Sequence, residues 1–174
     1  MKLIILGAPG SGKGTQAKLL AEKFHLHHIS SAVLHAEIQK GTSLGKKIHT
    51  SITKGELVPN HLANPLYKKN IPKDHFILDG APRDLVQARY LHHVFTPDHI
   101  IFLNVPVTVL KKRLLKRALL EGREDDTPAV IARRIHVYHT KTEPVLRYYK
   151  KKLLTIDGNQ KPEKIFRTLL QRLR

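Results

Sequence analysis

The stretch GAPGSGKGTQ, residues 7–16, follows the apolar run MKLIIL and constrains the fold more than any other part of the chain. Its glycines let backbone N–H groups approach a phosphate, and its Lys can reach the outer phosphates of a nucleotide. Such a loop needs a strand before it and a helix after it, because the positive helix end contributes to anion binding. The usual ending is Lys followed by Ser or Thr, whereas Gly14 follows Lys13 here and Thr15 comes one position late.

Apolar runs alternate with helical patterns along the chain. The expected strands are residues 2–6, 26–30, 75–79, 99–105 and 152–157, and four of these runs are continuous, as in strands buried on both faces. The expected helices are residues 13–24, 31–40, 44–54, 60–70, 84–94, 106–120, 128–149 and 162–173. This alternation predicts an α/β fold, and together with the loop of residues 7–16 it predicts a P-loop NTPase fold with a five-stranded parallel sheet flanked by helices.

Two segments look like insertions into this pattern. Residues 31–60 contain KGTSLGKK and TKGELVP, and in residues 117–134 the stretch EGREDDTP interrupts a basic helical pattern. The 174 residues suit a single domain. Its core would comprise residues 1–30, 61–116 and 135–174.

The composition excludes several classes of site. The chain has no cysteine, which rules out disulfides, thiolate zinc sites and Cys nucleophiles. The first apolar run, Leu3 to Leu6, is too short for a signal peptide or a membrane span. We therefore expect a soluble, cytoplasmic protein without membrane association.

The charge is strongly positive, with 31 Lys and Arg against 14 acidic residues and a net charge of +17. Residues 1–104 hold 13 basic and 7 acidic residues, and residues 105–174 hold 18 and 7. Such a field attracts polyanions, namely nucleotides, nucleic acids or acidic membranes. A solvated basic surface without a specific partner is an equally open interpretation.

Further motifs follow the loop in a fixed order: KGELVPN (54–60), LDGAPRD (78–84), RLLKR (113–117), GREDD (122–126), ARRI (132–135), TEP (142–144) and IDG (156–158). Together with GAPGSGKGTQ, this series resembles the adenylate kinases and their nucleoside monophosphate kinase relatives, in the form with a short lid. In that family Gly also follows the loop Lys, and Mg²⁺ is held mostly through waters and phosphates. The resemblance implies a nucleoside-monophosphate-binding (acceptor) insertion at 31–60 and a short lid at 117–134.

The resemblance implies reversible phosphoryl transfer from MgATP to AMP, giving two ADP, by a monomer. Mg²⁺ would come with ATP, and a zinc lid is excluded because there is no cysteine. Phosphoryl transfer depends on positioning and on neutralising charge, so it needs converging cations rather than a general base. The implied catalytic residues are Lys13, Arg83, Arg117, Arg123 and Arg134.

The resemblance also implies the two nucleotide sites. ATP would contact Gly7, Pro9, Gly10, Ser11, Gly12, Lys13, Gly14, Thr15, Arg113, Arg117 and Gly158. AMP would contact Ser31, Glu56, Leu57, Val58, Gly80, Arg83, Gln87, Arg123 and Arg134. Asp79 would hold Mg²⁺ through water, and Asp125 and Asp126 would orient the lid arginines. Gln87 favours AMP, because a side-chain amide can pair with the edge of adenine.

One segment departs from the family pattern. Where the family reads Ser-Thr-Gly-Asp-x-x-Arg, the chain reads SSAVLHAEI (30–38), which puts Ala36 where an Arg would bind the acceptor phosphate. This predicts weak use of AMP. Lys40 lies one helical turn further on, and we hypothesise that its long side chain partly replaces the missing Arg.

Twelve histidines invite a metal-binding interpretation. His136 and His139 are three residues apart on an expected helix and could face one way, whereas the adjacent His92 and His93 could not. Surface histidines are the favoured interpretation.

Two rival functions stay open. The chain could be a divergent kinase with another acceptor or slight activity. It could instead be a basic, nucleotide-responsive protein that binds RNA or another polyanion, for which nucleic-acid binding would not be sequence-specific. Few aromatic residues alternate with basic ones, which speaks against specific single-strand recognition.

Overall fold

A computed structural model describes residues 1–121 and 127–173 of the chain. Its centre is a parallel sheet of five strands in the order β2-β3-β1-β4-β5. The strands are β1 (Lys2–Leu6), β2 (His27–Ile29), β3 (Phe76–Asp79), β4 (His99–Asn104) and β5 (Leu153–Asp157). β1 pairs with β3 on one side, where Ile5 lies opposite Asp79, and with β4 on the other, where Leu6 lies opposite Phe102.

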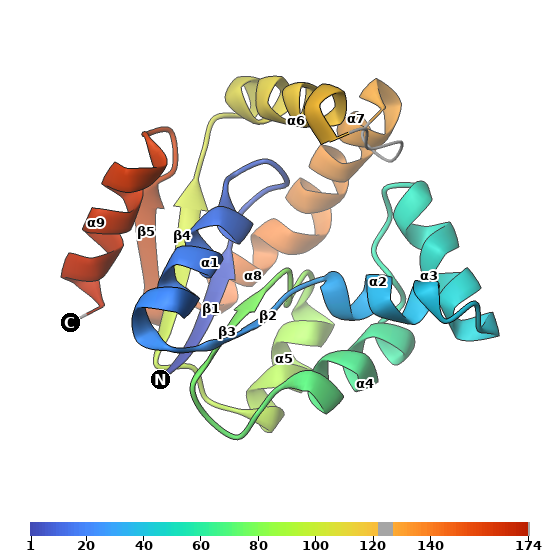
Figure 1. Cartoon of the computed structure of the whole chain (residues 1–174), viewed down its shortest axis with the longest axis horizontal. Helices are drawn as coiled ribbons and strands as arrows, with labels where there is room; N and C mark the ends of the chain where they lie inside the picture. Colours follow the sequence, from blue (N-terminus) through green and yellow to red (C-terminus); the bar gives the residue numbers. More distant parts are fainter. Residues whose placement is uncertain (122–126, 174) are drawn as a thin grey trace.

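Helices cover both faces of the sheet (Figure 1). They are α1 (Lys13–Phe24), α2 (Ala32–Gln39), α3 (Ser43–Thr53), α4 (Asn60–Asn70), α5 (Leu85–Val94), α6 (Val107–Glu121), α7 (Pro128–Val137), α8 (Glu143–Tyr148) and α9 (Pro162–Arg172). A π-helical turn, Tyr138–Thr142, joins α7 to α8, and a short 3₁₀ turn, Lys150–Lys152, precedes β5.

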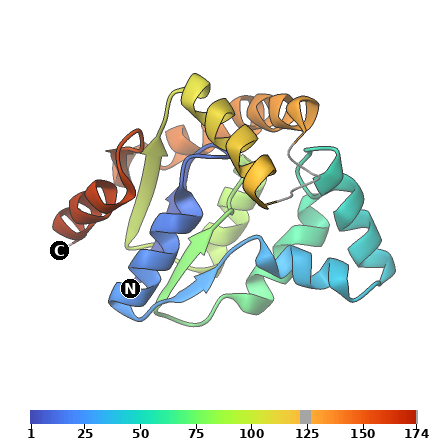
Figure 2. The ribbon, with the colours of Figure 1, turned by 45° about the horizontal axis from the view of Figure 1, so that its top comes forward.

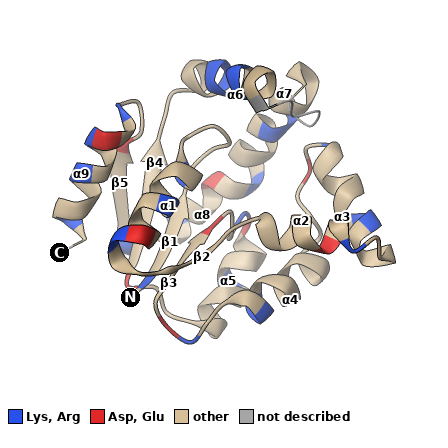
Figure 3. Ribbon diagram, in the orientation of Figure 1, with Lys and Arg blue, Asp and Glu red and all other residues tan. Residues whose placement is uncertain are grey.

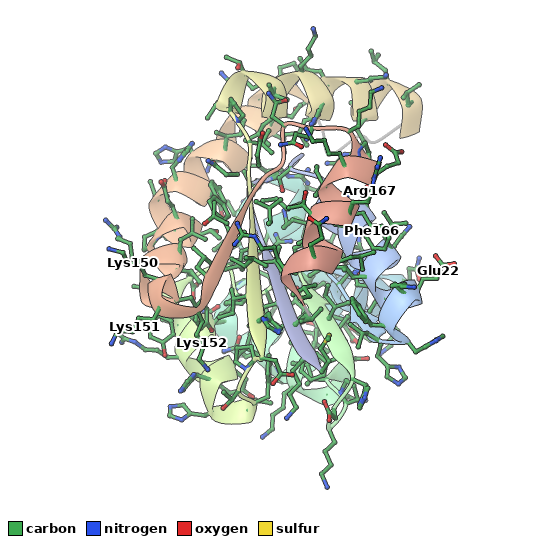
Figure 4. All side chains as sticks on the ribbon, turned by 90° about the vertical axis from the view of Figure 1, so that its left-hand side faces the viewer. Glu22, Lys150, Lys151, Lys152, Phe166 and Arg167 are labelled. Carbon is green, nitrogen blue, oxygen red and sulfur yellow. The ribbon has the colours of Figure 1, made fainter. Side chains whose placement is uncertain are left out.

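The central strand shows why its sequence is continuously apolar. Side chains alternate between the faces of a strand, so Leu3 and Ile5 enter the core beneath α1 and α9, while Ile4 and Leu6 enter the core beneath α4, α5 and α8. In Figure 4, α9, which carries Phe166 and Arg167, lies beside α1, which carries Glu22. The predicted fold, a parallel sheet buried on both faces, is confirmed.

The strand order locates the functional end of the sheet. The chain moves from β1 to one side for β2 and β3, and then crosses to the other side of β1 for β4 and β5. Ligands of open α/β sheets bind at such a switch point, outside the carboxyl ends of the strands. The loop after β1, Asp79 at the end of β3 and the start of α6 after β4 all lie at this end.

Figure 2 shows two helical units beside the sheet, α2 with α3 and α6 with α7. α2 and α3 pack on each other to one side of the sheet, and α6 lies above the carboxyl ends of the strands. Leu114 of α6 packs against Ile131 and Ile135 of α7, which fixes these two helices together. Within residues 1–121 and 127–173, no helix combines the length and the apolar character needed to cross a bilayer.

Candidate functional site

The loop between β1 and α1 has the backbone geometry that its sequence predicts. Gly10 and Gly12 have φ of +81° and +90°, a region that other residues rarely adopt. A methyl group on Gly10 would lie 3.0 Å from Leu114 Cγ and 3.1 Å from the carbonyl oxygen of Leu110. α1 begins at Lys13 with Gly12 as its N-cap. Backbone N–H groups and the positive helix end therefore meet at one place, as phosphate binding requires.

Lys13 lies at the bottom of this loop. Its Nζ donates a hydrogen bond of 2.9 Å to the carbonyl oxygen of Ala8. Burial lowers the pKa of Lys13 from 10.5 to about 8; the charge of Asp79 opposes this shift, whereas Arg83 and Arg117 add to it. An anion bound beside this ammonium would stabilise its charged form, because it would offset both the burial and the repulsion from the neighbouring cations.

A cavity of about 850 Å³ opens above the loop, of the size that nucleotide-sized ligands occupy. It brings together most of the residues predicted for the two sites. From the predicted ATP site it is lined by Gly7, Pro9, Gly10, Gly12, Lys13, Gly14, Thr15, Arg113 and Arg117. From the predicted AMP site it is lined by Ser31, Glu56, Leu57, Val58, Gly80, Arg83, Gln87 and Arg134. Asp79 lies between the two groups in the same lining.

Two predicted ATP contacts lie behind the cavity wall. Ser11 is buried, and within the described part of the chain its hydroxyl has no hydrogen-bond partner. Gly158 supports Arg113, since its carbonyl oxygen accepts a 3.1 Å hydrogen bond from Nη2 of Arg113. This bond holds the guanidinium of Arg113 against the β5–α9 loop, at the edge of the cavity.

Asp79 closes β3 and faces α1. A methyl group on Gly14 would lie 3.5 Å from Oδ2 of Asp79, and Nε2 of His28 lies 3.6 Å from the same oxygen. The variant Gly14 therefore sits directly opposite this carboxylate. Carboxylate oxygens suit Mg²⁺, and the start of α1 with Lys13 in the adjacent loop suits a phosphate neighbour. The donor set thus fits Mg²⁺ together with a nucleotide.

A hydrogen-bond network organises the start of α5. Arg83 donates from its backbone N–H to Oε1 of Gln87 at 2.8 Å and from Nε to the carbonyl oxygen of Gly80 at 2.7 Å. Asp84 caps the helix by accepting from the backbone N–H of Gln87 at 2.8 Å. Thr142, in the π-helical turn, donates 2.7 Å to the carbonyl oxygen of Arg83. The amide of Gln87 is thereby fixed by the backbone of Arg83, and the guanidinium of Arg83 is fixed by Gly80.

α7 contacts the segment that follows α3. Nη2 of Arg133 in α7 donates 3.1 Å to Oε1 of Glu56, and both side chains are about half exposed. A methyl group on Gly55 would lie 3.1 Å from the carbonyl oxygen of Val130. The segment after α3 therefore contacts α7, and Arg134 lines the cavity on the neighbouring helix face. Three predicted lid residues, Arg123, Asp125 and Asp126, lie outside the described residues.

The structure corrects the expectation for α2. The predicted acceptor position, Ala36, is exposed and points away from the cavity, whereas Ser31, Leu34 and His35 line it. The hypothesis that Lys40 replaces the missing Arg is wrong: Nζ of Lys40 donates 2.6 Å to Glu37, and its side chain is 60% exposed, outside the cavity lining. Successive helix residues are rotated by about 100°, so an offset of one residue changes which side chain faces the site.

Besides His35, sequence reasoning missed four further polar or charged residues of the cavity wall: Lys18, Tyr67, Tyr138 and Thr142. Tyr67 is buried, which raises the pKa of its hydroxyl, and it donates 3.4 Å to the carbonyl oxygen of Gly80. Lys18 follows Gly14 by four residues on the same helix face, so helical spacing was the available signal. Thr142 stood inside the quoted TEP motif without an assigned role.

Positive charge is also spread over surfaces away from the cavity. Lys and Arg follow one another along α6 (Figure 3), and Lys150, Lys151 and Lys152 form an exposed turn before β5 (Figure 4).

The two histidines expected to share a helix face have different surroundings. His139 contacts Glu143 at 2.9 Å, and His136 lines a smaller cavity of about 420 Å³ beside Glu56. Among the described residues, no group of three His, Asp or Glu side chains is placed to hold a metal ion.

Comparison with known proteins gives consistent matches. A family model described as adenylate kinase matches residues 5–154. An adenylate kinase from a Cyanothece species is 41% identical over 172 residues, which cover 91% of this chain and 88% of the relative. Adenylate kinase 1 of Schistosoma mansoni is 39% identical, over 94% of this chain and 88% of the relative. An adenylate kinase of Thermus thermophilus is 36% identical, over 94% of this chain and 92% of the relative.

Proposed function

The chain belongs to the adenylate kinase family, and from this premise we propose that it transfers a phosphoryl group reversibly from MgATP to AMP, giving two ADP. The observation that carries the proposal is the single cavity that holds both the phosphate loop with Lys13 and the Arg83–Gln87 pair. Two nucleotides bound at these two ends would point their phosphates at each other.

The donor end suits ATP. The loop of residues 7–15 and the start of α1 would hold the phosphates through backbone N–H groups, with Lys13 bridging the outer phosphates. Arg113, held against Gly158, would lie beside the adenine, and Arg117 would reach the transferred phosphoryl group. The remaining predicted ATP contacts, Gly7 to Thr15, belong to the same loop.

The acceptor end suits AMP. Arg83 would bind the acceptor phosphate, and the neighbouring Gln87 would pair with the edge of adenine through its amide. Ser31, Gly80 and the segment Glu56–Val58 would complete the pocket. The lining of one cavity by both residues supports this assignment, and the backbone N–H of Arg83 orients the amide of Gln87.

The chemistry needs little beyond this arrangement. In phosphoryl transfer the protein aligns the attacking oxygen and neutralises charge on the equatorial oxygens. Lys13, Arg83, Arg117 and Arg134 converge from different elements on one cavity, and Arg123 is the fifth cation of the proposed set. Asp79 is the residue that would hold Mg²⁺ through water, and this ion would neutralise charge on the ATP phosphates.

We assign the movable parts to the two insertions. Residues 31–60 would close over the acceptor and residues 117–134, with Asp125 and Asp126 orienting the lid arginines, would close over the phosphates. The core, residues 1–30, 61–116 and 135–174, would stay fixed. Closure would exclude water, which prevents hydrolysis of ATP. The ion pair between Glu56 and Arg133 is about half exposed and therefore weak, so it leaves the two insertions free to move apart.

An acceptor panel tests the proposal. ADP formation from MgATP is measured with AMP, CMP, UMP and GMP in separate reactions. We expect robust turnover with AMP. Turnover with another monophosphate alone would indicate a divergent kinase. ATP binding without turnover, together with RNA binding that weakens steeply with salt, would favour the polyanion-binding alternative that the net charge of +17 raises.

A further inference from the structure

Within the described residues, two side chains of α2 line the cavity, Leu34 and His35, and of these only His35 is polar. We propose that the imidazole of His35 binds the phosphate of the acceptor nucleotide opposite Arg83, which makes acceptor affinity depend on pH. This proposal rests on the proposed function, because it assigns a residue to the acceptor site of that reaction.

The register of α2 supports this assignment. Ser31, Leu34 and His35 line the cavity, and their spacing of three and four residues places them on one face of the helix. Leu34 is buried beneath this face, whereas His35 is exposed at its surface. The imidazole is thus the polar group that α2 offers to the cavity one turn beyond Ser31, about 6 Å along the helix.

Gly80 lies between the guanidinium of Arg83 and the first turn of α2. A methyl group on Gly80 would lie 3.4 Å from Nη2 of Arg83 and 3.5 Å from the backbone nitrogen of Ser31. The guanidinium and the first turn of α2 therefore flank the same point. A phosphate bound by Arg83 at this point lies next to the face that carries His35, one helical turn away.

The chemistry of the acceptor explains why a second group is needed there. The phosphate of a nucleoside monophosphate carries close to two negative charges above about pH 7. Arg83 can neutralise one charge, and each phosphate oxygen can accept more than one hydrogen bond, so a second donor can bind beside Arg83 and leave one oxygen for the attack on ATP. An imidazole donates from a ring N–H in either charge state, and it carries a positive charge only at acid pH, since its ordinary pKa is about 6.5.

Other charged groups share the cavity, and all of them must be considered in a pH experiment. On its own helix the nearest acid, Glu37, is bound to Lys40. Among the described residues, the titratable and charged side chains that line the cavity from other elements are Lys13, Lys18, Glu56, Tyr67, Asp79, Arg83, Arg113, Arg117, Arg134 and Tyr138. Of these, Lys13 has a pKa of about 8, so its effect falls at higher pH than that of an ordinary imidazole.

The experiment compares His35→Arg, His35→Ala and the wild type in steady-state kinetics, with AMP and MgATP varied in turn. We expect His35→Ala to raise the KM for AMP about tenfold and His35→Arg to lower it, with the KM for ATP unchanged in both. Between about pH 6 and pH 8 the wild-type KM for AMP should rise, whereas that of His35→Arg should stay flatter, because Arg stays charged.

Ala36→Arg is the matched control, since position 36 is exposed and rotated away from the cavity. It adds the same side chain one residue further and should leave the KM for AMP unchanged. Melting temperatures establish that all variants are folded. An unchanged KM for AMP in both His35 variants, or a lowered KM in Ala36→Arg instead of His35→Arg, would overturn the proposal. A wild type that forms no ADP from AMP would overturn the proposed function itself.

Discussion

The backbone N–H of Arg83 donates a 2.8 Å hydrogen bond to Oε1 of Gln87, so the last residue of the DGAPR motif positions the amide four residues later. Asp84 strengthens the arrangement by capping the helix through the backbone of Gln87. Gln87 is only 3% exposed, yet it lines the cavity. A carbonyl oxygen has two acceptor sites, so Oε1 can also accept from the amino group of adenine.

Replacing Gln87 by Leu should therefore weaken AMP binding specifically. A bidentate contact of an amide with adenine discriminates by about 1–3 kcal/mol, which corresponds to roughly a 5- to 150-fold rise in the KM for AMP. Kinetics with AMP varied at saturating MgATP measure this. The matched control is Gln16→Leu, a buried amide on α1 bonded to Pro162, which should lower stability without selecting against AMP. Equal effects on the KM for both nucleotides would contradict the assignment.

The lowered pKa of Lys13 predicts that the protein takes up protons when ATP binds. In the free protein its pKa is about 8, because burial disfavours the charged form. Phosphates favour the charged form, so binding at pH 8 should take up about half a proton, and affinity should fall as the pH rises above 8. Calorimetry in buffers of different ionisation enthalpy measures the uptake. A binding enthalpy independent of the buffer at pH 8 would contradict this prediction.

The same shift has a consequence for stability without nucleotide. A base whose pKa is lower in the folded state destabilises the fold at pH values below that pKa, and the cost is relieved as the pH rises toward the unfolded value. For Lys13 the relief falls between about pH 8 and 10.5. Lys13→Met removes this titration, so its stability gain over the wild type should shrink across that interval in urea unfolding experiments.

Gly10 and Gly14 should respond differently to alanine. At Gly10 the φ of +81° and the close approach of Leu114 and Leu110 make any Cβ unfavourable, so Gly10→Ala should lose at least about 1–2 kcal/mol of stability. At Gly14 the added Cβ would be 3.5 Å from Asp79, an ordinary contact, and Ala favours the helix. Urea unfolding of both variants compares them. A Gly14→Ala variant less stable than Gly10→Ala would contradict this geometry.

The ion pair between Glu56 and Arg133 should contribute little to stability. Both side chains are about half exposed, and such pairs are worth at most about 1 kcal/mol in water. A double-mutant cycle with Glu56→Gln and Arg133→Gln should give a coupling energy below about 1 kcal/mol that declines with added salt. A larger, salt-insensitive coupling would show that the two insertions are locked together rather than lightly joined.

Most of the architecture could be predicted from the sequence, because local signals and tertiary packing agree. The continuous apolar runs are strands buried on both faces, and Asp84 and Thr127 cap their helices by accepting hydrogen bonds from Gln87 and Val130. In the loop of residues 7–16, Gly10 and Gly12 adopt positive φ angles that other residues rarely adopt, so the glycines indicate the backbone path. In these places the residue type alone restricts the backbone.

The acceptor side could be predicted less well. The departure at SSAVLHAEI was visible, but the sequence could not decide which residue of α2 faces the cavity, since that depends on where the helix begins. The π-helical turn at Tyr138–Thr142 was equally hidden, because residues 128–149 were expected to form one continuous helix and no residue type marks an inserted position. Thr142 acquires its contact with Arg83 only through that turn.

The central claim is direct transfer between two nucleotides bound in one cavity. It is tested most directly by following the label from ATP carrying ³²P at the γ-position, in the presence of Mg²⁺ and AMP. The proposed reaction predicts that the label appears in the β-position of ADP, in step with ADP formation and without release of inorganic phosphate. Label released as inorganic phosphate, or retained in ATP while AMP is unchanged, would contradict it.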